Sequence, residues 1–292
     1  MLPRIAFSAA LIAALLAVPA AAHAAAVVQP SSVATTALLS PGRTHTVSLV
    51  CPSPSVALNA AVTGTGPGVR VRRSSPGSEA GTWRLRVAVG PGGSRRVRAV
   101  LRCVRLDLPS GVSGARLGTK TRRQFSVAVP AGGTASVRLR CGPAWLATGY
   151  GLERGTSDDV RLAEVVPSAH GWDFVLENTG HAAVRAGVSA RCLKQTVTAS
   201  RDGGTAQLRF RITRPTFPFV LTGGGSPTIL QACGAGAFSL ATGSRVEAAD
   251  PIELFRSAPV RARGGSWTFR RANAGDTGQV SLVCLSRGSV FH

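Results

Sequence analysis

One motif, Cys…Trp…Cys, occurs three times in this chain of 292 residues at a period of about 90 residues. The three copies are Cys51…Trp83…Cys103, Cys141…Trp172…Cys192 and Cys233…Trp267…Cys284. Successive first cysteines are 90 and 92 residues apart, and each Trp follows the first cysteine of its copy by 31 to 34 residues. Self-similarity at such a period predicts a tandem array of structural units.

The first 24 residues have the features of a secretory signal peptide. A single charge at Arg4 precedes an apolar run over residues 9–18, and Ala22-His23-Ala24 has the small residues of a cleavage site. The run is shorter than the about 20 residues that span a membrane, and Arg, Pro or Gly interrupts every later apolar segment. We therefore expect a mature chain without a transmembrane segment, secreted or associated with the cell envelope.

Six cysteines in an exported chain predict disulfides rather than metal ligands. Each repeat carries its own pair, so we expect the bonds Cys51–Cys103, Cys141–Cys192 and Cys233–Cys284. Each would close a loop of about 52 residues, which stabilises the fold by roughly 4 kcal/mol in the chain-entropy model. No pair has the short Cys-x₂₋₄-Cys spacing of structural zinc sites, and no metal is expected.

The pattern between the cysteines predicts an all-β fold. Turn residues such as Pro41-Gly42 and Pro130-Ala-Gly-Gly133 separate stretches in which apolar and polar residues alternate. About 89 residues a repeat suit a small β-sandwich, so we expect three tandem antiparallel β-sandwich domains. Their predicted bounds are 27–115, 116–204 and 205–292.

The conserved position of the Trp within each copy predicts its environment. We expect Trp83, Trp172 and Trp267 in the domain cores, each beside a disulfide. In immunoglobulin domains the Trp lies in the strand after the first Cys, whereas here it precedes the second Cys by 17 to 20 residues. The predicted sandwiches therefore have the size of immunoglobulin domains without their topology.

Alternation also predicts two hairpins in each repeat. In the clearest one, Trp83 lies opposite Cys103 and Leu85 opposite Leu101, which puts the apolar residues on one face. A second hairpin would lead into each first cysteine, with its apolar residues 12 positions before that cysteine. These positions are Leu39, Val129 and Leu221.

The second repeat resembles a Cys-Pro-Ala-Gly…Gly-Gly-Tyr…Gly-Trp…Asn…Cys repeat found in secreted and surface proteins of high-GC Gram-positive bacteria. The matching segments are Cys141-Gly-Pro-Ala144, Thr148-Gly-Tyr-Gly151, Gly171-Trp172, Asn178-Thr-Gly180 and Arg191-Cys192. The resemblance covers about 50 residues of each unit. Repeat one departs from it at Asn59-Ala60, and in repeat three Ala241-Thr-Gly243 is shifted by about two residues. It implies an extracellular location and a structural motif, without an assigned chemistry.

Catalytic motifs are not evident. The mature chain has four histidines, none in a recognisable catalytic setting: His45, His170, His181 and His292. Gly114-Ala-Arg-Leu-Gly118 is followed by Thr119 before Lys120, whereas a phosphate loop needs Gly and Lys adjacent. We therefore expect no enzyme activity and no cofactor.

Acidic residues cluster in the second repeat. They are Glu153, Asp158, Asp159, Glu164, Asp173 and Glu177. A Ca²⁺ site or a carboxylate pair for glycoside hydrolysis stays an alternative. The predicted hairpin register favours ordinary ion pairing, since it places Asp173 opposite Arg191 on an exposed face.

The chain has 34 Lys and Arg against 13 Asp and Glu, a formal net charge of +21. Only Lys120 and Lys194 are lysines, so part of the arginine excess has the composition that a GC-rich genome produces. The arginines of the first predicted hairpin lie on its outward face, with Arg84 opposite Arg102. This set is Arg84, Arg86, Arg96, Arg98 and Arg102. Guanidinium groups suit phosphate and carboxylate.

Two functional classes follow. The first is a non-catalytic structural or adhesion module at the bacterial surface, which engages another surface protein or extends the surface. The second is a binding protein whose arginine face takes an anionic cell-wall polymer such as a teichoic acid, an acidic polysaccharide or anionic lipid headgroups. Nucleic acid is not expected, because exposed aromatic residues for base stacking are missing. An enzyme ranks third.

Overall fold

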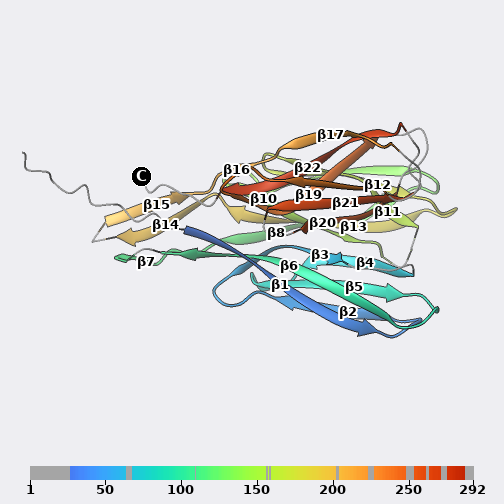
Figure 1. Ribbon diagram of the computed structural model, residues 1–292, viewed down its shortest axis with the longest axis horizontal. Helices are drawn as coiled ribbons and strands as arrows, with labels where there is room; N and C mark the ends of the chain where they lie inside the picture. The colour runs from blue at the N-terminus through green and yellow to red at the C-terminus, as the bar shows by residue number, and fades with distance from the viewer. Residues whose placement is uncertain are drawn as a thin grey trace, which may run out of the picture.

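The computed structural model describes residues 27–63, 68–108, 110–155, 157, 159–201, 204–222, 227–247, 253–260, 263–270 and 275–286. The described chain is all-β, with antiparallel pairing in every sheet (Figure 1). The predicted signal peptide, residues 1–24, lies outside the described residues. Among the described residues there is no long apolar helix of the kind that crosses a membrane.

A six-stranded sheet has the order β2-β5-β4-β10-β13-β8. Its strands are β2 (Thr44–Val50), β5 (Thr82–Val89), β4 (Val69–Pro76), β10 (Trp145–Glu153), β13 (Val184–Lys194) and β8 (Thr119–Val129). A seven-stranded sheet has the order β16-β22-β19-β11-β12-β9, and β17 also pairs with β22. Its strands are β16 (Ile212–Thr213), β17 (Thr216–Val220), β22 (Thr277–Ser286), β19 (Ala237–Glu247), β11 (Val160–Ser168), β12 (Gly171–Asn178) and β9 (Thr134–Arg140).

Three smaller sheets complete the fold. The N-terminal sheet has the order β1-β6-β3 and consists of β1 (Val27–Leu39), β6 (Arg95–Asp107) and β3 (Val56–Thr63). The C-terminal sheet has the order β18-β21-β20 and consists of β18 (Thr228–Ala232), β21 (Gly264–Arg270) and β20 (Glu253–Val260). A linker sheet of β15 (Gly204–Arg209), β14 (Thr196–Arg201) and β7 (Val112–Ser113) lies at the left-hand end of Figure 1.

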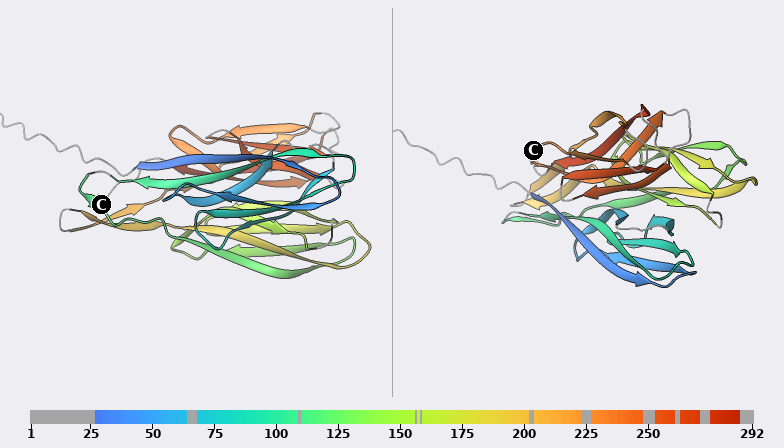
Figure 2. Two further views of the ribbon diagram at one scale, coloured as in Figure 1. Left: turned by 90° about the horizontal axis from the view of Figure 1, so that it is seen from below. Right: turned by 45° about the vertical axis from the view of Figure 1, so that its right-hand side comes forward.

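The two large sheets cross the boundaries between repeats. In the six-stranded sheet β4 of the first repeat pairs with β10 of the second through Arg73 and Glu153. In the seven-stranded sheet β11 of the second repeat pairs with β19 of the third through Val165 and Ser244. Strand β20 of the third repeat lies beside β3 of the first, although they belong to separate sheets. The repeats therefore lie around a common centre (Figure 2), and a division into separate sandwich domains stays a prediction.

Each disulfide ties two different sheets together. The bonds are Cys51–Cys103, Cys141–Cys192 and Cys233–Cys284, the pairs that the repeat spacing predicts. The first cysteine of each pair follows a strand of one sheet, and the second lies within a strand of another. Trp83, Trp172 and Trp267 are fully buried, as expected, in hydrophobic clusters that also contain the disulfides.

The predicted hairpins are wrong. Trp83 on β5 pairs with Leu49 and Pro76, whereas Cys103 on β6 pairs with Ser31 and Ala57. The two strands belong to different sheets that share one hydrophobic cluster. Alternation puts apolar residues on an inner face in either arrangement, so it does not distinguish neighbouring strands from strands that face each other across a core.

The predicted hairpins before each first cysteine are wrong for the same reason. Strands β1 and β2, β8 and β9, and β17 and β18 lie in different sheets. The expected turn residues are present, and Gly42 and Gly132 have φ of 68° and 58°, in the left-handed region that glycine adopts without strain. The apolar residues at the end of β1, at the end of β8 and directly after β17 are buried: Leu39, Val129 and Leu221. The turns thus carry the chain from one sheet to another.

The centre of the molecule is formed by one β-bulge from each repeat. The extra residues are Leu58 in β3, Thr148 in β10 and Leu240 in β19, each seven positions after the first cysteine of its repeat. All three are fully buried, and the three strands contact one another. Bulges bend a strand and redirect its side chains. Here they turn the three strands towards a shared core.

Glycines on β10 allow this close approach. A Cβ atom at Gly149 would lie 1.9 Å from the carbonyl oxygen of Leu58, and one at Gly151 would lie 2.0 Å from that of Ser74. Both carbonyls belong to the first repeat. The Thr148-Gly-Tyr-Gly151 segment is therefore needed for contact between repeats.

We predict that Gly151→Ala lowers the free energy of unfolding by about 2 kcal/mol or more, because the added methyl group overlaps backbone that cannot move aside. Gly234→Ala is the matched control: a Cβ there meets nothing within 4 Å, and we expect a change within about 0.5 kcal/mol. Urea denaturation of both variants measures the difference. Equal stability of the two variants would contradict the packing of β10 on β4.

Candidate functional site

The outward face of the six-stranded sheet is continuous from the first repeat to the second. Along one row of ladder partners Arg86 on β5 is paired with Arg73 on β4, and Arg73 with Glu153 on β10. Arg73 Nη1 also forms an ion pair of 3.2 Å with Glu153 Oε1. Arg84 lies two residues before Arg86 on the same exposed side of β5. We call this surface the arginine face.

The structure divides the five arginines of the predicted polyanion site between two surfaces. Arg84 and Arg86 lie on the arginine face, whereas Arg96, Arg98 and Arg102 lie on β6 in the N-terminal sheet. A hydrophobic cluster fills the space between the two sheets. The outward side chains of β5 and β6 therefore point in opposite directions.

Arg84 and Arg102 are not ladder partners, contrary to the predicted register. Arg84 pairs with Ser48 and Ser75, and Arg102 with Ser32 and Asn59. Arg102 is 7% exposed and donates a hydrogen bond to Ser32 Oγ. Burial lowers the pKa of Arg102 to about 10. Arg102 is thus part of the packing of repeat one and does not belong to an exposed binding face.

Two arginines of the second repeat reach across to the first. Arg123 on β8 donates from Nη2 to the carbonyl oxygen of Pro76 at 2.8 Å. Arg191 on β13 is 2% exposed and donates to the carbonyl oxygen of Thr82 at 3.3 Å and to Thr121 Oγ1 at 3.2 Å. Burial, and secondly the charge of Arg123, lower the pKa of Arg191 to about 10. The junction between the repeats therefore holds two neighbouring positive charges.

A small pocket lies at this junction. Its lining includes Arg73, Ser75, Arg123, Phe125, Glu153 and Ser189. The Ser189 side chain is 5% exposed, and its Oγ atom has no hydrogen-bond partner. A buried hydroxyl without a partner costs free energy relative to one in water. The pocket thus contains an unsatisfied polar group beside a guanidinium.

Phe125 stands at the edge of this pocket on an irregular part of β8. The ladder between β8 and β13 breaks so that Phe125 and Ser126 together oppose Gly187. Ser126 has φ of 60°, a conformation that costs a non-glycine residue free energy. The irregularity turns Phe125 over Gly187, 3.5 Å from the position of a Cβ atom there, and leaves it 58% exposed.

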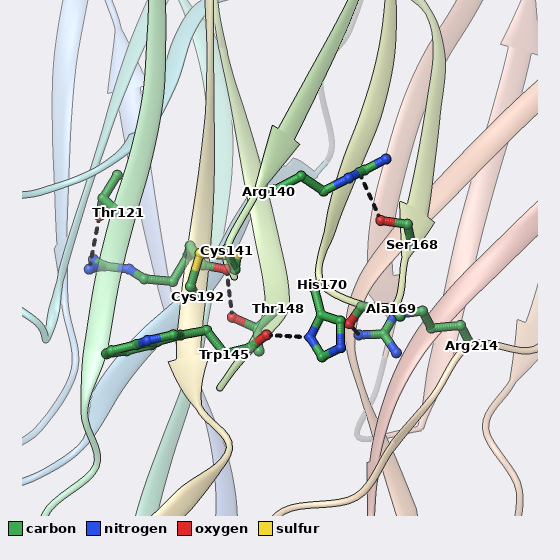
Figure 3. Close-up of a disulfide and its surroundings, with 11 residues drawn as sticks. Thr121, Arg140, Cys141, Trp145, Thr148, Ser168, Ala169, His170, Cys192 and Arg214 are labelled. Atoms are coloured by element: carbon green, nitrogen blue, oxygen red, sulfur yellow. Dashed lines mark hydrogen bonds between the residues drawn. A yellow bond between two sulfur atoms is a disulfide. The ribbon is translucent and has the colours of Figure 1, made fainter. Parts of the chain in front are cut away.

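The surroundings of the second disulfide are structural. Thr148 Oγ1 donates to the carbonyl oxygen of Arg191 at 3.1 Å, and His170 Nδ1 lies 2.9 Å from the carbonyl oxygen of Trp145 (Figure 3). Arg214 donates to the carbonyl oxygen of Ala169 at 2.8 Å, and burial lowers its pKa. These contacts use backbone acceptors and fasten one strand end to another.

The acidic residues of the second repeat do not converge. Asp173 pairs with Arg138 and Arg140, at 3.0 and 2.9 Å, and not with Arg191 as the hairpin register predicts. Glu153, Glu164 and Glu177 form ion pairs with other arginines, and Asp158 lies outside the described residues. In the described parts of the chain no three His, Cys, Asp or Glu side chains are grouped to hold a metal ion.

Most of the junction site was not predicted from the sequence. Arg123, Phe125, Ser189 and Arg191 belong to the second repeat, while Pro76 and Thr82 belong to the first. Only the pairing of β4 with β10 brings these segments together. No local signal marked Phe125, which alternation groups with the apolar residues Val127 and Val129 of β8 although the structure leaves it exposed.

Comparison of the chain with protein-family models and with curated proteins gives no match.

We predict that Ser126→Gly is more stable than Ser126→Ala by about 1 kcal/mol, because glycine adopts a positive φ without the steric cost of a Cβ atom. Ser126 is exposed, so lost packing contributes little to either variant. Thermal or urea unfolding of the two variants provides the comparison. If the alanine variant is equally stable, the backbone at Ser126 is not strained.

Proposed function

We propose that this protein is a secreted, non-catalytic β-repeat protein that acts as a rigid structural or adhesion module outside the cell. The supporting observation is that each disulfide links two sheets, while each of the two large sheets contains paired strands from different repeats. Disulfides are typical of oxidising compartments. Within this proposal each repeat forms a two-sheet sandwich, and the three sandwiches share the central core.

A second function is favoured by the arginine face. It binds anionic polymers of the cell envelope, with acidic polysaccharide as the preferred class. Arg84 and Arg86 are exposed on a surface that continues into the second repeat as far as Arg123. The planar guanidinium group of arginine can bind a carboxylate through two parallel hydrogen bonds. A net charge of +21 also favours association with polyanions at low salt.

The two functions differ in how the protein fractionates with cells. A module without affinity for polymers is expected in the culture medium of producing cells. A polymer-binding protein is expected with washed cells and in the salt eluate, because salt screens its charges. Immunoblots of medium, salt eluate and cell residue distinguish the two.

We predict that Arg84→Gln with Arg86→Gln weakens binding to polygalacturonate about fivefold or more at 50 mM salt, and that it reduces the dependence of affinity on salt. Arg96→Gln with Arg98→Gln is the matched control, since it removes the same charge from the opposite surface. We expect that control to stay within about twofold of wild type. Affinity electrophoresis measures both.

Equal losses in the two double variants would mean that net charge alone drives retention. That outcome would contradict a role for the arginine face and leave the structural module as the function.

A further inference from the structure

We propose that the junction pocket between repeats one and two is a subsite for one acidic sugar residue of a bound polymer. The sugar ring would lie on Phe125, and its carboxylate would reach Arg123 and the Ser189 hydroxyl. This proposal rests on the proposed binding of acidic polysaccharides and names the part of the surface that recognises the sugar.

The first argument is the position of Phe125. Its ring is 58% exposed, next to a charged pocket, and does not lie in a hydrophobic core. Single exposed apolar residues occur on many proteins. The exposed position of Phe125, however, depends on a backbone conformation at Ser126 that costs free energy. The ring lies against Gly187, which has no side chain to displace it. The apolar face of a sugar ring packs well on an aromatic ring placed in this way.

The second argument is the chemistry of the pocket. Arg123 uses Nη2 for the bond to Pro76, and its guanidinium has further N–H donors. Ser189 Oγ is 5% exposed and unpartnered. A carboxylate is an acceptor for both groups, and it would offset the mutual repulsion of Arg123 and Arg191. The pocket is small, so the sugar ring would lie across its mouth and only the carboxylate would point into it.

The third argument is continuity with the arginine face. From Phe125 the row of ladder neighbours runs over Gly187 to Glu153, Arg73 and Arg86. The carboxylate of Glu153 is paired with Arg73, which limits its repulsion of an anionic chain. A polymer seated at Phe125 can therefore continue along the sheet towards the arginines of the first repeat.

The test uses the full mature chain and three probes that separate ring from charge. Polygalacturonate carries both, polyglutamate carries charge without a sugar ring, and dextran carries rings without charge. We expect wild type to bind polygalacturonate most tightly and dextran least, measured by isothermal titration calorimetry. Arg123→Gln should weaken binding of both acidic polymers.

Phe125→Ala should weaken polygalacturonate binding about tenfold and polyglutamate binding less than about twofold, because the ring contact is made only with the sugar. Phe125→Trp should retain the affinity for polygalacturonate. Leu38→Ala is the matched control, since Leu38 is 71% exposed on edge strand β1 of the N-terminal sheet. It should bind all three probes as wild type does.

Two outcomes overturn the proposal and differ in what else they affect. If Phe125→Ala binds polygalacturonate as wild type does while the Arg84 and Arg86 double variant does not, the subsite is wrong and the arginine face stands. If wild type binds neither acidic polymer, the subsite and the polymer-binding function fail together.

Discussion

The contact of three bulged strands, one from each repeat, holds this structure together. Strands β3, β10 and β19 contact one another, and their bulge residues Leu58, Thr148 and Leu240 are all fully buried. No repeat can bury its bulge alone. The hydrophobic effect that closes this centre also brings β4 to β10 and β11 to β19, and it thereby creates the two large sheets.

The disulfides and the central core stabilise different parts of the structure. Each disulfide lies within one repeat and joins the two sheets to which that repeat contributes. The core joins repeats. Val28, Val56, Leu58 and Val104 of the first repeat belong to the same cluster as Trp172 of the second, and not to the cluster around Trp83. Stiffness inside a repeat and stiffness between repeats thus have separate physical origins.

The arrangement of the repeats also decides where a ligand can be recognised. Arginines of one repeat form only a charged strip. At the junction a guanidinium, an unpartnered hydroxyl and an exposed aromatic ring come from strands that are distant in sequence but adjacent in the sheet. Charge attracts an anion without selecting it. Selection requires shape and hydrogen-bonding groups, and here β8 and β13 of repeat two supply them beside a pocket that repeat one also lines.

The amino-acid sequence by itself determined the all-β class, the three disulfide pairs and the burial of the three tryptophans. These follow from alternation and from a repeated spacing, which are local properties that three copies reinforce. The turn residues were also predicted correctly, but not what the turns connect. Apolar residues face inward whether two strands are neighbours in a sheet or face each other across a core, so Arg84 was wrongly placed opposite Arg102.

Only the tertiary structure decided which edges of the repeats join, and with that the junction site. Strand pairing is made by backbone hydrogen bonds that carry no sequence signature, so nothing local marks β4 and β10 as partners. Gly149 and Gly151 permit the close approach of repeat one, whereas in the sequence alone they stood out only as part of the repeat motif. Arg123, Phe125 and Ser189 are neighbours through the pairing of β8 with β13 inside repeat two, and the joining of β4 to β10 adds Arg73 and Ser75 of repeat one to their surroundings.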